Sequence, residues 1–364
     1  MQTTSRIDRL RAAMRAADMT AVAVVPGANL LYLLGLTMHT SERLALAFIP
    51  QSGDIRMVLP ALEQPRAAAE AQAAIRFYSW HDAEGYAEAL AACLHEMQPQ
   101  ARLGIEYTAM RVLELRAIEA VAAVETVDAT DLVAELRMVK DAAELQAMQA
   151  AARAVEAGLR AAIDAIKPGV SEREVAEVWE RAMREAGSAP SFTTIVASGP
   201  NSANPHYTTG DRRLQQGDLV VLDGGARFGG YASDITRTVA VGEPSAEARR
   251  IYEVVLAANR AGVAAARPGT SGAEIDGAAR RVIEDAGYGQ YFIHRTGHGL
   301  GIEIHEPPYL HANSTAALLA GTTFTVEPGV YVAGVGGVRI EDDVVLTEQG
   351  AECLTTFDRE LTIC

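Results

Sequence analysis

The second half of the chain contains four acidic residues whose positions suggest metal chemistry: Asp223, Asp234, Glu327 and Glu341. Asp223 and Glu327 each follow a short apolar run, so we expect both at the ends of buried strands, where an unpaired carboxylate is costly. Asp234 and Glu341 come 11 and 14 residues later, spacings that fit two adjacent antiparallel strands joined by a turn. Four carboxylates without cations would also repel one another. A pair of divalent metal ions among them would remove both costs.

Histidines are concentrated in the same part of the sequence. Three of the eight histidines, His294, His298 and His305, lie within 12 residues, separated by glycines that let the backbone approach a ligand closely. A single histidine is more often structural, but three at this density beside acids predict a site. His206 precedes the first pair of acids, as His305 precedes the second pair.

An internal repeat explains how these groups could meet. Residues 166–187 align with residues 266–287 at an offset of 100 without gaps, and the Pro-Gly pair, a serine, a glutamate and the closing glycine recur in place. We therefore expect two related halves, about 140–245 and 246–360, packed with pseudo-twofold symmetry around one cleft. Any one acid could instead cap a helix or pair with Arg237 or Arg339, but four in corresponding places favour metal binding.

Four motifs resemble those of the pita-bread metallopeptidases, which include methionine aminopeptidase, aminopeptidase P and prolidase. They are Asp-Gly-Gly with Tyr-Ala-Ser-Asp-Ile-Thr-Arg-Thr within 222–238, Gly-His-Gly-Leu-Gly and its trailing His-Glu within 297–306, Val-Glu-Pro-Gly at 326–329, and Arg-Ile-Glu-Asp at 339–342. The resemblance covers about residues 135–364 closely. The first 130 residues resemble the creatinase/prolidase N-terminal domain more weakly.

The resemblance implies five metal ligands: Asp223, Asp234, His298, Glu327 and Glu341. Asp223 would bind one ion and His298 the other, Asp234 and Glu341 would bridge both, and Glu327 would bind the second ion beside the attacking water. Four carboxylates and one imidazole favour Mn²⁺ or Co²⁺, with Zn²⁺ possible. We expect two divalent ions per subunit, with Mn²⁺ preferred.

The implied chemistry is hydrolysis of a peptide bond. Water held between two cations becomes a good nucleophile near neutral pH, and Glu327 would accept its proton as general base. By resemblance, His206 and His305 are catalytic and would stabilise the oxyanion. His294 would line the pocket for proline, and Arg339 would orient a carboxylate ligand.

The N-terminal region favours the Xaa-Pro branch of this family, since methionine aminopeptidases usually lack a separate domain there. The bond before proline is a tertiary amide without an N–H. We expect an Xaa-Pro dipeptidase acting on small peptides with proline at position two. The alternatives are aminopeptidase P acting on longer peptides, a metal-free hydrolase like creatinase, and a non-catalytic binding module. The complete ligand set disfavours the last two.

A dipeptidase needs a positive group for the carboxylate of proline. Some prolidases place an arginine between the second catalytic histidine and Glu-Pro-Gly, but residues 306–326 contain no arginine or lysine. The loop 36–43 lies between two expected strands and could reach over the cleft of a dimer partner. Arg43, aided by His39, is therefore our hypothesis for the carboxylate-binding group.

The expected fold class is α/β. We predict an N-terminal α/β domain at 1–132, with roles in substrate gating and oligomerisation, and a pita-bread catalytic domain at 133–364. In the first domain we expect helices at 5–19 and 83–97 and strands at 21–25, 45–49, 56–59 and 103–106. A long helix should begin near Asp141 and end at Lys167-Pro-Gly169.

Composition limits the remaining possibilities. The 364 residues are 49% hydrophobic and 22% charged, as in globular proteins, and the net charge of -15 disfavours nucleic acid or an anionic membrane as partner. Cys93, Cys353 and Cys364 are too few for a disulfide framework. The N-terminus lacks the apolar run of a signal peptide, and no apolar run is long enough to span a bilayer. We expect a cytoplasmic homodimer.

Overall fold

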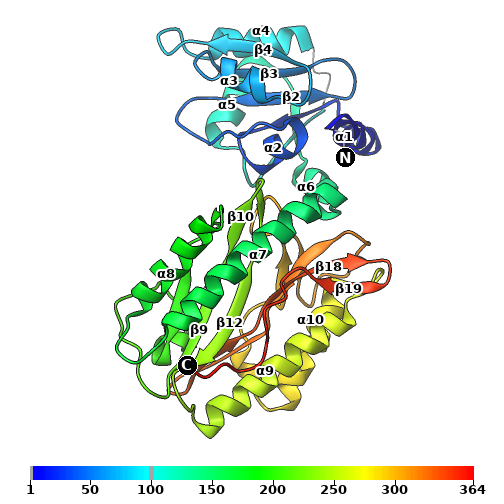
Figure 1. The fold of residues 1–364 in the computed structure, drawn as a ribbon. Helices are drawn as coiled ribbons and strands as arrows, with labels where there is room; N and C mark the ends of the chain where they lie inside the picture. Colours follow the sequence, from blue (N-terminus) through cyan, green and yellow to red (C-terminus); the bar gives the residue numbers. More distant parts are fainter. Residues whose placement is uncertain (1–2, 98–101) are drawn as a thin grey trace. The chain divides into compact units, whose positions relative to one another are not determined.

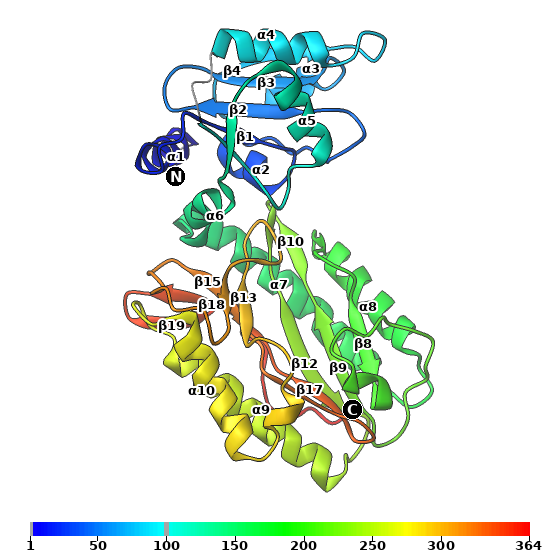
Figure 2. The same cartoon turned by 180° about the vertical axis from the view of Figure 1, so that it is seen from behind.

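The computed structural model describes residues 3–97 and 102–364, without the side chains of residues 3–5. It divides into two compact units, unit 1 (Met1–Arg137) and unit 2 (Met138–Cys364), shown in Figures 1 and 2. The boundary expected from the sequence, between residues 132 and 133, falls inside helix α6 (Thr130–Met138). Among the helices of the described ranges, none combines the length and apolar content that crossing a membrane requires.

Unit 1 is built on a mixed six-stranded sheet in the order β4-β3-β2-β1-β5-β6, in which only the pairs β1–β2 and β2–β3 are antiparallel. The strands are β1 (Ala21–Val24), β2 (Leu46–Pro50), β3 (Ile55–Pro60), β4 (Ile75–Trp80), β5 (Arg102–Ile105) and β6 (Glu125–Asp128). The helices before α6 are α1 (Thr3–Ala16), α2 (Ala28–Leu34), α3 (Gln64–Glu70), α4 (Ala87–Met97) and α5 (Val112–Val121). The elements predicted here are confirmed to within a few residues, and α2, α3, β4, α5, β6 and α6 are additional.

Unit 2 contains the two repeated helix pairs. Helix α7 (Ala142–Ala165) packs on α8 (Glu172–Glu185), and α9 (Ala246–Ala265) packs on α10 (Gly272–Asp285). In Figure 1 the first pair is green and the second yellow. Ser171 and Ser271 cap α8 and α10 through equivalent capping boxes. Gly169 and Gly269 have φ angles of 92° and 91°, so the repeated Pro-Gly pairs make the same left-handed turn.

The strands of unit 2 also repeat. Strand β9 pairs antiparallel with β12, and β15 pairs antiparallel with β18. Between the members of each pair lies a hairpin, β10–β11 in the first half and β16–β17 in the second. The simple turn expected between each pair of acids is therefore wrong, since a two-stranded hairpin fills each interval. The strands are β7 (Ala189–Pro190), β8 (Ile195–Ser198), β9 (Leu219–Gly224), β10 (Ala226–Phe228), β11 (Tyr231–Ala232), β12 (Ile235–Ala240), β13 (Gly297–Gly299), β14 (Glu306–Leu310), β15 (Thr323–Val326), β16 (Gly329–Val332), β17 (Gly336–Arg339), β18 (Asp342–Thr347) and β19 (Gly350–Cys353).

These strands form sheets in the orders β12-β9-β8, β11-β10-β7 and β14-β13-β15-β18-β19, with β16–β17 as a separate ribbon. The core of the first half centres on Trp179 of α8, which is fully buried. A Cβ atom at Gly224 would come within 2.9 Å of the Trp179 ring, so a glycine is needed directly after Asp223. The packing of α8 under β9 thus fixes the end of the strand that carries Asp223.

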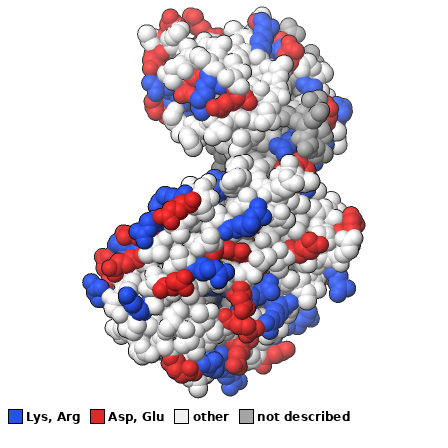
Figure 3. Space-filling view, in the orientation of Figure 1, with Lys and Arg blue, Asp and Glu red and all other residues white. Residues whose placement is uncertain are grey.

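Charged side chains of both signs are interspersed on the face drawn in Figure 3. The described residues of unit 2 seen there alternate basic and acidic groups, as expected for a solvated surface. Asp234, His298 and Glu341, three of the predicted metal ligands, are buried instead.

Candidate active site

A cavity of about 470 Å³ in unit 2 brings together the acids and histidines of both halves. Its polar lining consists of His206, Asp223, Asp234, His294, Arg295, His298, His305, Glu327, Arg339 and Glu341. Phe192, Ile195, Pro205 and Ile304 supply its apolar wall. Every residue predicted for the site is therefore present except Arg43 and His39, which belong to unit 1.

The strand ends position the five predicted ligands. Asp223 lies on β9 and His298 on β13, while Asp234, Glu327 and Glu341 stand directly before β12, after β15 and before β18. Because β9 pairs with β12 and β15 with β18, each pair of acids lies at one end of a strand pair.

Glycines let the strand of His298 approach its neighbours closely. A Cβ atom at Gly297 would lie 1.9 Å from the carbonyl oxygen of Thr325, and one at Gly299 would lie 2.3 Å from that of Pro307. Neither position can hold a larger residue without moving the backbone. The glycines around His298 therefore keep its ring close to Glu327 and Glu341, which flank β15 and β18.

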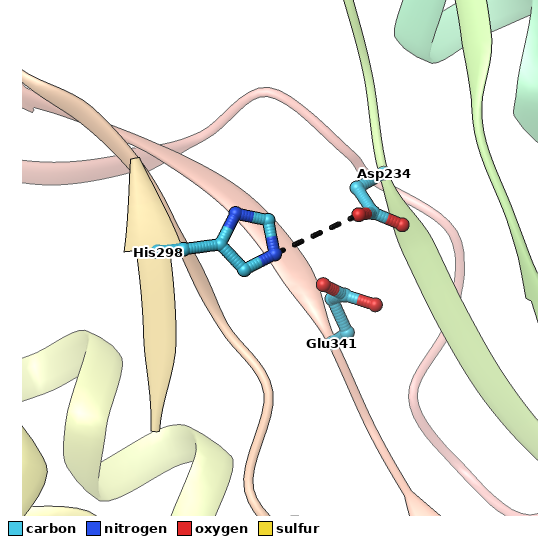
Figure 4. A group of neighbouring side chains, drawn as sticks. All are labelled: Asp234, His298 and Glu341. Carbon is cyan, nitrogen blue, oxygen red and sulfur yellow. Dashed lines mark ion pairs between the residues drawn. The ribbon is translucent and has the colours of Figure 1, made fainter. Parts of the chain in front are cut away.

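Three of these residues form a compact group, shown in Figure 4. One ligand atom from each of Asp234, His298 and Glu341 lies within 4.8 Å of the others, and all three side chains are buried. His298 Nε2 lies 3.9 Å from Asp234 Oδ2 and 3.4 Å from Glu327 Oε1. Among the described residues, Asp234 Oδ1 is buried without a hydrogen-bond partner. A buried carboxylate oxygen left in this state is the arrangement that a cation would satisfy.

The protonation of the site also fits a divalent ion. Burial lowers the pKa of His298 to about 3, and its Nδ1 lies 3.1 Å from the carbonyl oxygen of Gly299. The neutral ring thus donates from Nδ1 and turns the lone pair of Nε2 toward carboxylates. Burial, reinforced by neighbouring acids, raises the pKa of Asp234 and Glu341 well above the ordinary range. Burial also raises the pKa of Glu327 to about 7. An imidazole lone pair among crowded carboxylates suits a divalent metal, so the residues fit the ions expected from the sequence.

Arg339 connects the two pairs of acids. Its Nη2 donates to Asp223 Oδ2 at 2.5 Å, and its Nε donates to Thr236 Oγ1 at 3.1 Å. Thr236 in turn donates to Glu341 Oε2 at 2.6 Å. Arg339 is itself buried, so this network holds one acid from each half in a fixed orientation.

His294 belongs to the same network through Tyr331 of β16. The hydroxyl of Tyr331 lies 2.9 Å from both His294 Nε2 and Arg339 Nη1. His294 Nδ1 lies 2.7 Å from the carbonyl oxygen of Arg295, and burial lowers the pKa of His294 to about 4. The neutral ring therefore donates from Nδ1 and accepts the hydroxyl proton of Tyr331 at Nε2. This fixes the ring on the wall of the cavity.

The two remaining histidines are exposed. The ring of His305 packs edge-on against that of His298, with centroids 4.2 Å apart. His206 follows the short helix η1 (Gly199–Ala203), and its backbone N–H donates to the side chain of Asn204. Both imidazoles line the cavity from opposite halves of the repeat and are accessible to a substrate.

Arg43, the residue expected to bind the substrate carboxylate, is paired with acidic residues of unit 1. Arg43 donates to both carboxylate oxygens of Asp82, at 2.9 and 2.8 Å, and to Glu42 at 2.7 Å. His39 is exposed in the same loop.

Several residues of the site were missed from the sequence: Thr236, Arg295, Thr325, Tyr331 and Asp343. Asp343 accepts the backbone N–H of Asp234, and Thr325 accepts that of His298. Arg295 and Tyr331 stand within four residues of His298 and Glu327, so a search around each ligand would have found them. The roles of Thr236 and Thr325 depend on strand register, which the motifs do not show.

Comparison with known families agrees with this geometry. The model of Metallopeptidase family M24 matches residues 146–348. The chain belongs to this metallopeptidase family. The Creatinase/Prolidase N-terminal domain matches residues 6–139. Membership of this family implies that the chain binds divalent metal ions. The fold is confirmed as the predicted creatinase-type domain followed by a pita-bread domain.

Individual relatives extend the match. An Xaa-Pro dipeptidase of Pyrococcus furiosus is 46% identical over 232 residues, which cover 64% of this chain and 67% of the relative. A solved dipeptidase from Pyrococcus horikoshii is 40% identical, with a TM-score of 0.93 over 99% of this chain and 100% of that one. An X-Pro aminopeptidase structure from Thermotoga maritima is 31% identical, with a TM-score of 0.85 over 97% and 100% of the two chains.

Proposed function

We propose that this chain is a metal-dependent Xaa-Pro dipeptidase, which hydrolyses the bond before proline in a dipeptide and releases the N-terminal residue. The observation that carries the proposal is the proximity of the buried side chains of Asp234, His298 and Glu341. They lie in a cavity that is also lined by His206 and His305, the two histidines expected to be catalytic. The family match and the dipeptidases among the relatives support the same assignment.

Five residues would hold the metal: Asp223, Asp234, His298, Glu327 and Glu341. We infer two ions per subunit, with Mn²⁺ favoured over Co²⁺ or Zn²⁺ because most ligands are carboxylates. When bound, such ions polarise the scissile carbonyl and make a coordinated water acidic.

The protein side chains would divide the remaining work. Glu327 would take the proton of the attacking water on its carboxylate and pass it to the proline nitrogen that leaves. His206 and His305, which reach the cavity from opposite halves, would donate to the oxygen on which negative charge develops. His294, fixed by Tyr331, would face the proline ring, and Arg339 would keep Asp223 in its coordinating orientation.

The second candidate is aminopeptidase P activity on longer Xaa-Pro peptides. The X-Pro aminopeptidase structure aligned over 97% of this chain favours it. Relative rates on Ala-Pro and Ala-Pro-Ala distinguish the two activities, because only a dipeptidase requires the carboxylate to follow proline directly.

Three further proposals come from the sequence alone. The N-terminal domain would gate the substrate and form a cytoplasmic homodimer, whose size analytical ultracentrifugation would measure.

Arg43, with His39, would bind the substrate carboxylate from the dimer partner. Arg43→Ala would then raise KM for Xaa-Pro dipeptides while sparing tripeptides. To bind a substrate carboxylate, Arg43 would have to give up its hydrogen bonds to Asp82.

The direct test of the function is hydrolysis of Ala-Pro by protein that has been treated with a chelator and then supplied with Mn²⁺. We expect loss of activity after chelation, recovery with the metal, and about two ions per chain by elemental analysis. Protein that remains metal-free under these conditions and cleaves neither Ala-Pro nor Ala-Pro-Ala would contradict the proposal.

A further inference from the structure

A second cavity, of about 370 Å³, adjoins the active-site cavity. Both cavities have His294 and Arg295 in their walls, so these two residues form the partition between them. The far cavity also includes Phe292, Ile293 and Asp276 in its lining, and the side chain of Ile293 is 66% exposed. A chain that extended past proline through this partition would enter a partly apolar hollow.

Three arginines line these two cavities, and two of them have fixed anionic partners. Arg339 is bonded to Asp223 and Tyr331. Arg280 donates twice to the carboxylate of Asp276 and also to backbone oxygens on the segment before β13. Their guanidinium groups are therefore already occupied within the protein.

Arg295 differs from both. The centre of its guanidinium lies 4.4 Å from the centroid of the Tyr309 ring, a cation–π contact. Within residues 3–97 and 102–364, no carboxylate lies within ion-pairing distance of Arg295, and its side chain makes no hydrogen bond. An aromatic face supports the cation from one side and leaves its N–H groups available to an incoming carboxylate.

Strand pairing brings Arg295 beside the segment 306–326, in which some prolidases carry an arginine. In the β13–β14 pair, His298 stands opposite Tyr309, and the backbone of Thr296 donates to Leu310. Arg295, three residues before His298, is thereby brought over Tyr309, which lies four residues after His305. The segment 306–326 thus contributes the supporting ring, and the segment before His298 contributes the charge.

We propose that Arg295, supported by Tyr309, takes the role proposed above for Arg43: it binds the terminal carboxylate of an Xaa-Pro dipeptide and closes the cleft to longer peptides. This inference rests on the proposed function and names the group that selects its substrate. A bidentate arginine–carboxylate pair recognises a free C-terminus specifically, because an amide or a further residue cannot accept both hydrogen bonds with a negative charge.

The test compares three substrates in Mn²⁺: Ala-Pro, Ala-Pro-amide and Ala-Pro-Ala. Arg295→Gln removes the charge and keeps most of the length of the side chain. We expect it to lower kcat/KM for Ala-Pro by about 10- to 100-fold, mainly through KM, and to change the rate on Ala-Pro-amide less than about 3-fold. Arg295→Ala should also raise the rate on Ala-Pro-Ala relative to Ala-Pro, because it joins the two cavities.

Two controls keep the result specific. Arg281→Ala removes an exposed arginine of α10 outside the two cavities and should leave all three rates unchanged. Arg295→Lys retains the charge without the planar fork and should recover part of the Ala-Pro activity. Elemental analysis and thermal melting of each variant check that metal and fold are retained.

Equal losses on Ala-Pro and Ala-Pro-amide would overturn the assignment, as would a selective loss in Arg43→Ala with none in Arg295→Gln. If Arg295→Gln does not fold, inhibition of the unmodified enzyme decides. Proline should then inhibit at least about 10-fold more tightly than prolinamide, and equal inhibition would contradict the proposal. Failure of the proposed function is separate, since the unmodified enzyme would then cleave none of the three substrates.

Discussion

The two halves of unit 2 share a scaffold but differ in the side chains that they direct into the cleft. In the first half, Ala197 pairs with Val221, two residues before Asp223. In the second half, the backbone N–H of His298 bonds to Thr325, two residues before Glu327. His298 therefore occupies the strand position that a small buried alanine holds in the first half.

The same contrast recurs beside the later acids. Arg339 stands two residues before Glu341, whereas Ala232 stands two residues before Asp234. Arg339 reaches across to Asp223 and so links the halves. The repeat thus supplies the acids in duplicate, and the second half alone adds the predicted imidazole ligand and an arginine bonded to the side chain of a predicted ligand, Asp223. The site is therefore asymmetric although the scaffold around it is repeated.

The largest effect should come from the substitution that makes the halves most alike, His298→Ala. It removes the nitrogen ligand and leaves carboxylates alone in a buried site. We expect kcat/KM on Ala-Pro to fall by about 10³-fold or more, since several kcal/mol of charge stabilisation would be lost. Elemental analysis should show less metal per chain. Full activity with unchanged metal content would exclude His298 as a ligand.

A smaller loss of activity is expected from Arg339→Ala, which introduces the residue that the first half has at the corresponding position, Ala232. Asp223 would lose its charged partner, and outer partners of metal ligands typically contribute 10- to 100-fold, so we expect about that decrease in kcat/KM. The measurement is steady-state kinetics with a Mn²⁺ titration. Arg339→Lys, as the charge-retaining control, should lie between the two. An alanine variant with normal metal affinity and activity would show that the network has no role.

The halves can also be compared through two buried acids that hold the strands leading into the cleft. Glu172 of α8 accepts the backbone N–H and hydroxyl of Ser198, at 2.8 and 2.7 Å. Asp276 of α10 does the same for Thr296, at 3.2 and 2.7 Å. Glu172→Gln and Asp276→Asn should each reduce the free energy of unfolding by about 1–3 kcal/mol. Urea unfolding measures this, and a loss in only one variant would show that the two anchors are not equivalent.

The smallest effect concerns the pH dependence of the metal-free protein. The pKa of Glu327 is raised to about 7, so the folded state binds its proton more tightly than the unfolded chain does. Stability from this group is present at low pH and is lost as pH rises through 7. The buried His294 and His298, with lowered pKa values, act oppositely, but only below their unfolded pKa of about 6.5.

Between pH 6.5 and 8, we therefore expect Glu327 alone to cost the metal-free protein on the order of 1 kcal/mol of stability, about 1–2 °C in Tm, and the raised pKa values of Asp234 and Glu341 add to this loss. Scanning calorimetry after chelation measures this change. Protein loaded with Mn²⁺ should not show it, because bound metal requires deprotonated ligands. An equal decrease with and without Mn²⁺ would assign the effect to other groups.

Most of the residues that line the active-site cavity could be predicted from the sequence because local motifs and a gap-free repeat carry them. The capping serines Ser171 and Ser271 and the turn glycines mark equivalent helices without any knowledge of contacts. What could not be predicted depends on pairing between distant strands. Arg295 meets Tyr309 only because β13 lies against β14, and the hairpins between the acids follow no periodicity strong enough to distinguish them from a turn.

The predicted ligands come from both halves of unit 2, with Asp223 and Asp234 on the first and His298, Glu327 and Glu341 on the second. Ions bound among them would cross-link two segments about 100 residues apart, and by mass action they would stabilise the folded state as free metal rises above its dissociation constant. Divalent-ion supply would therefore govern how long the protein persists in a cell, as well as how fast it turns over its substrate.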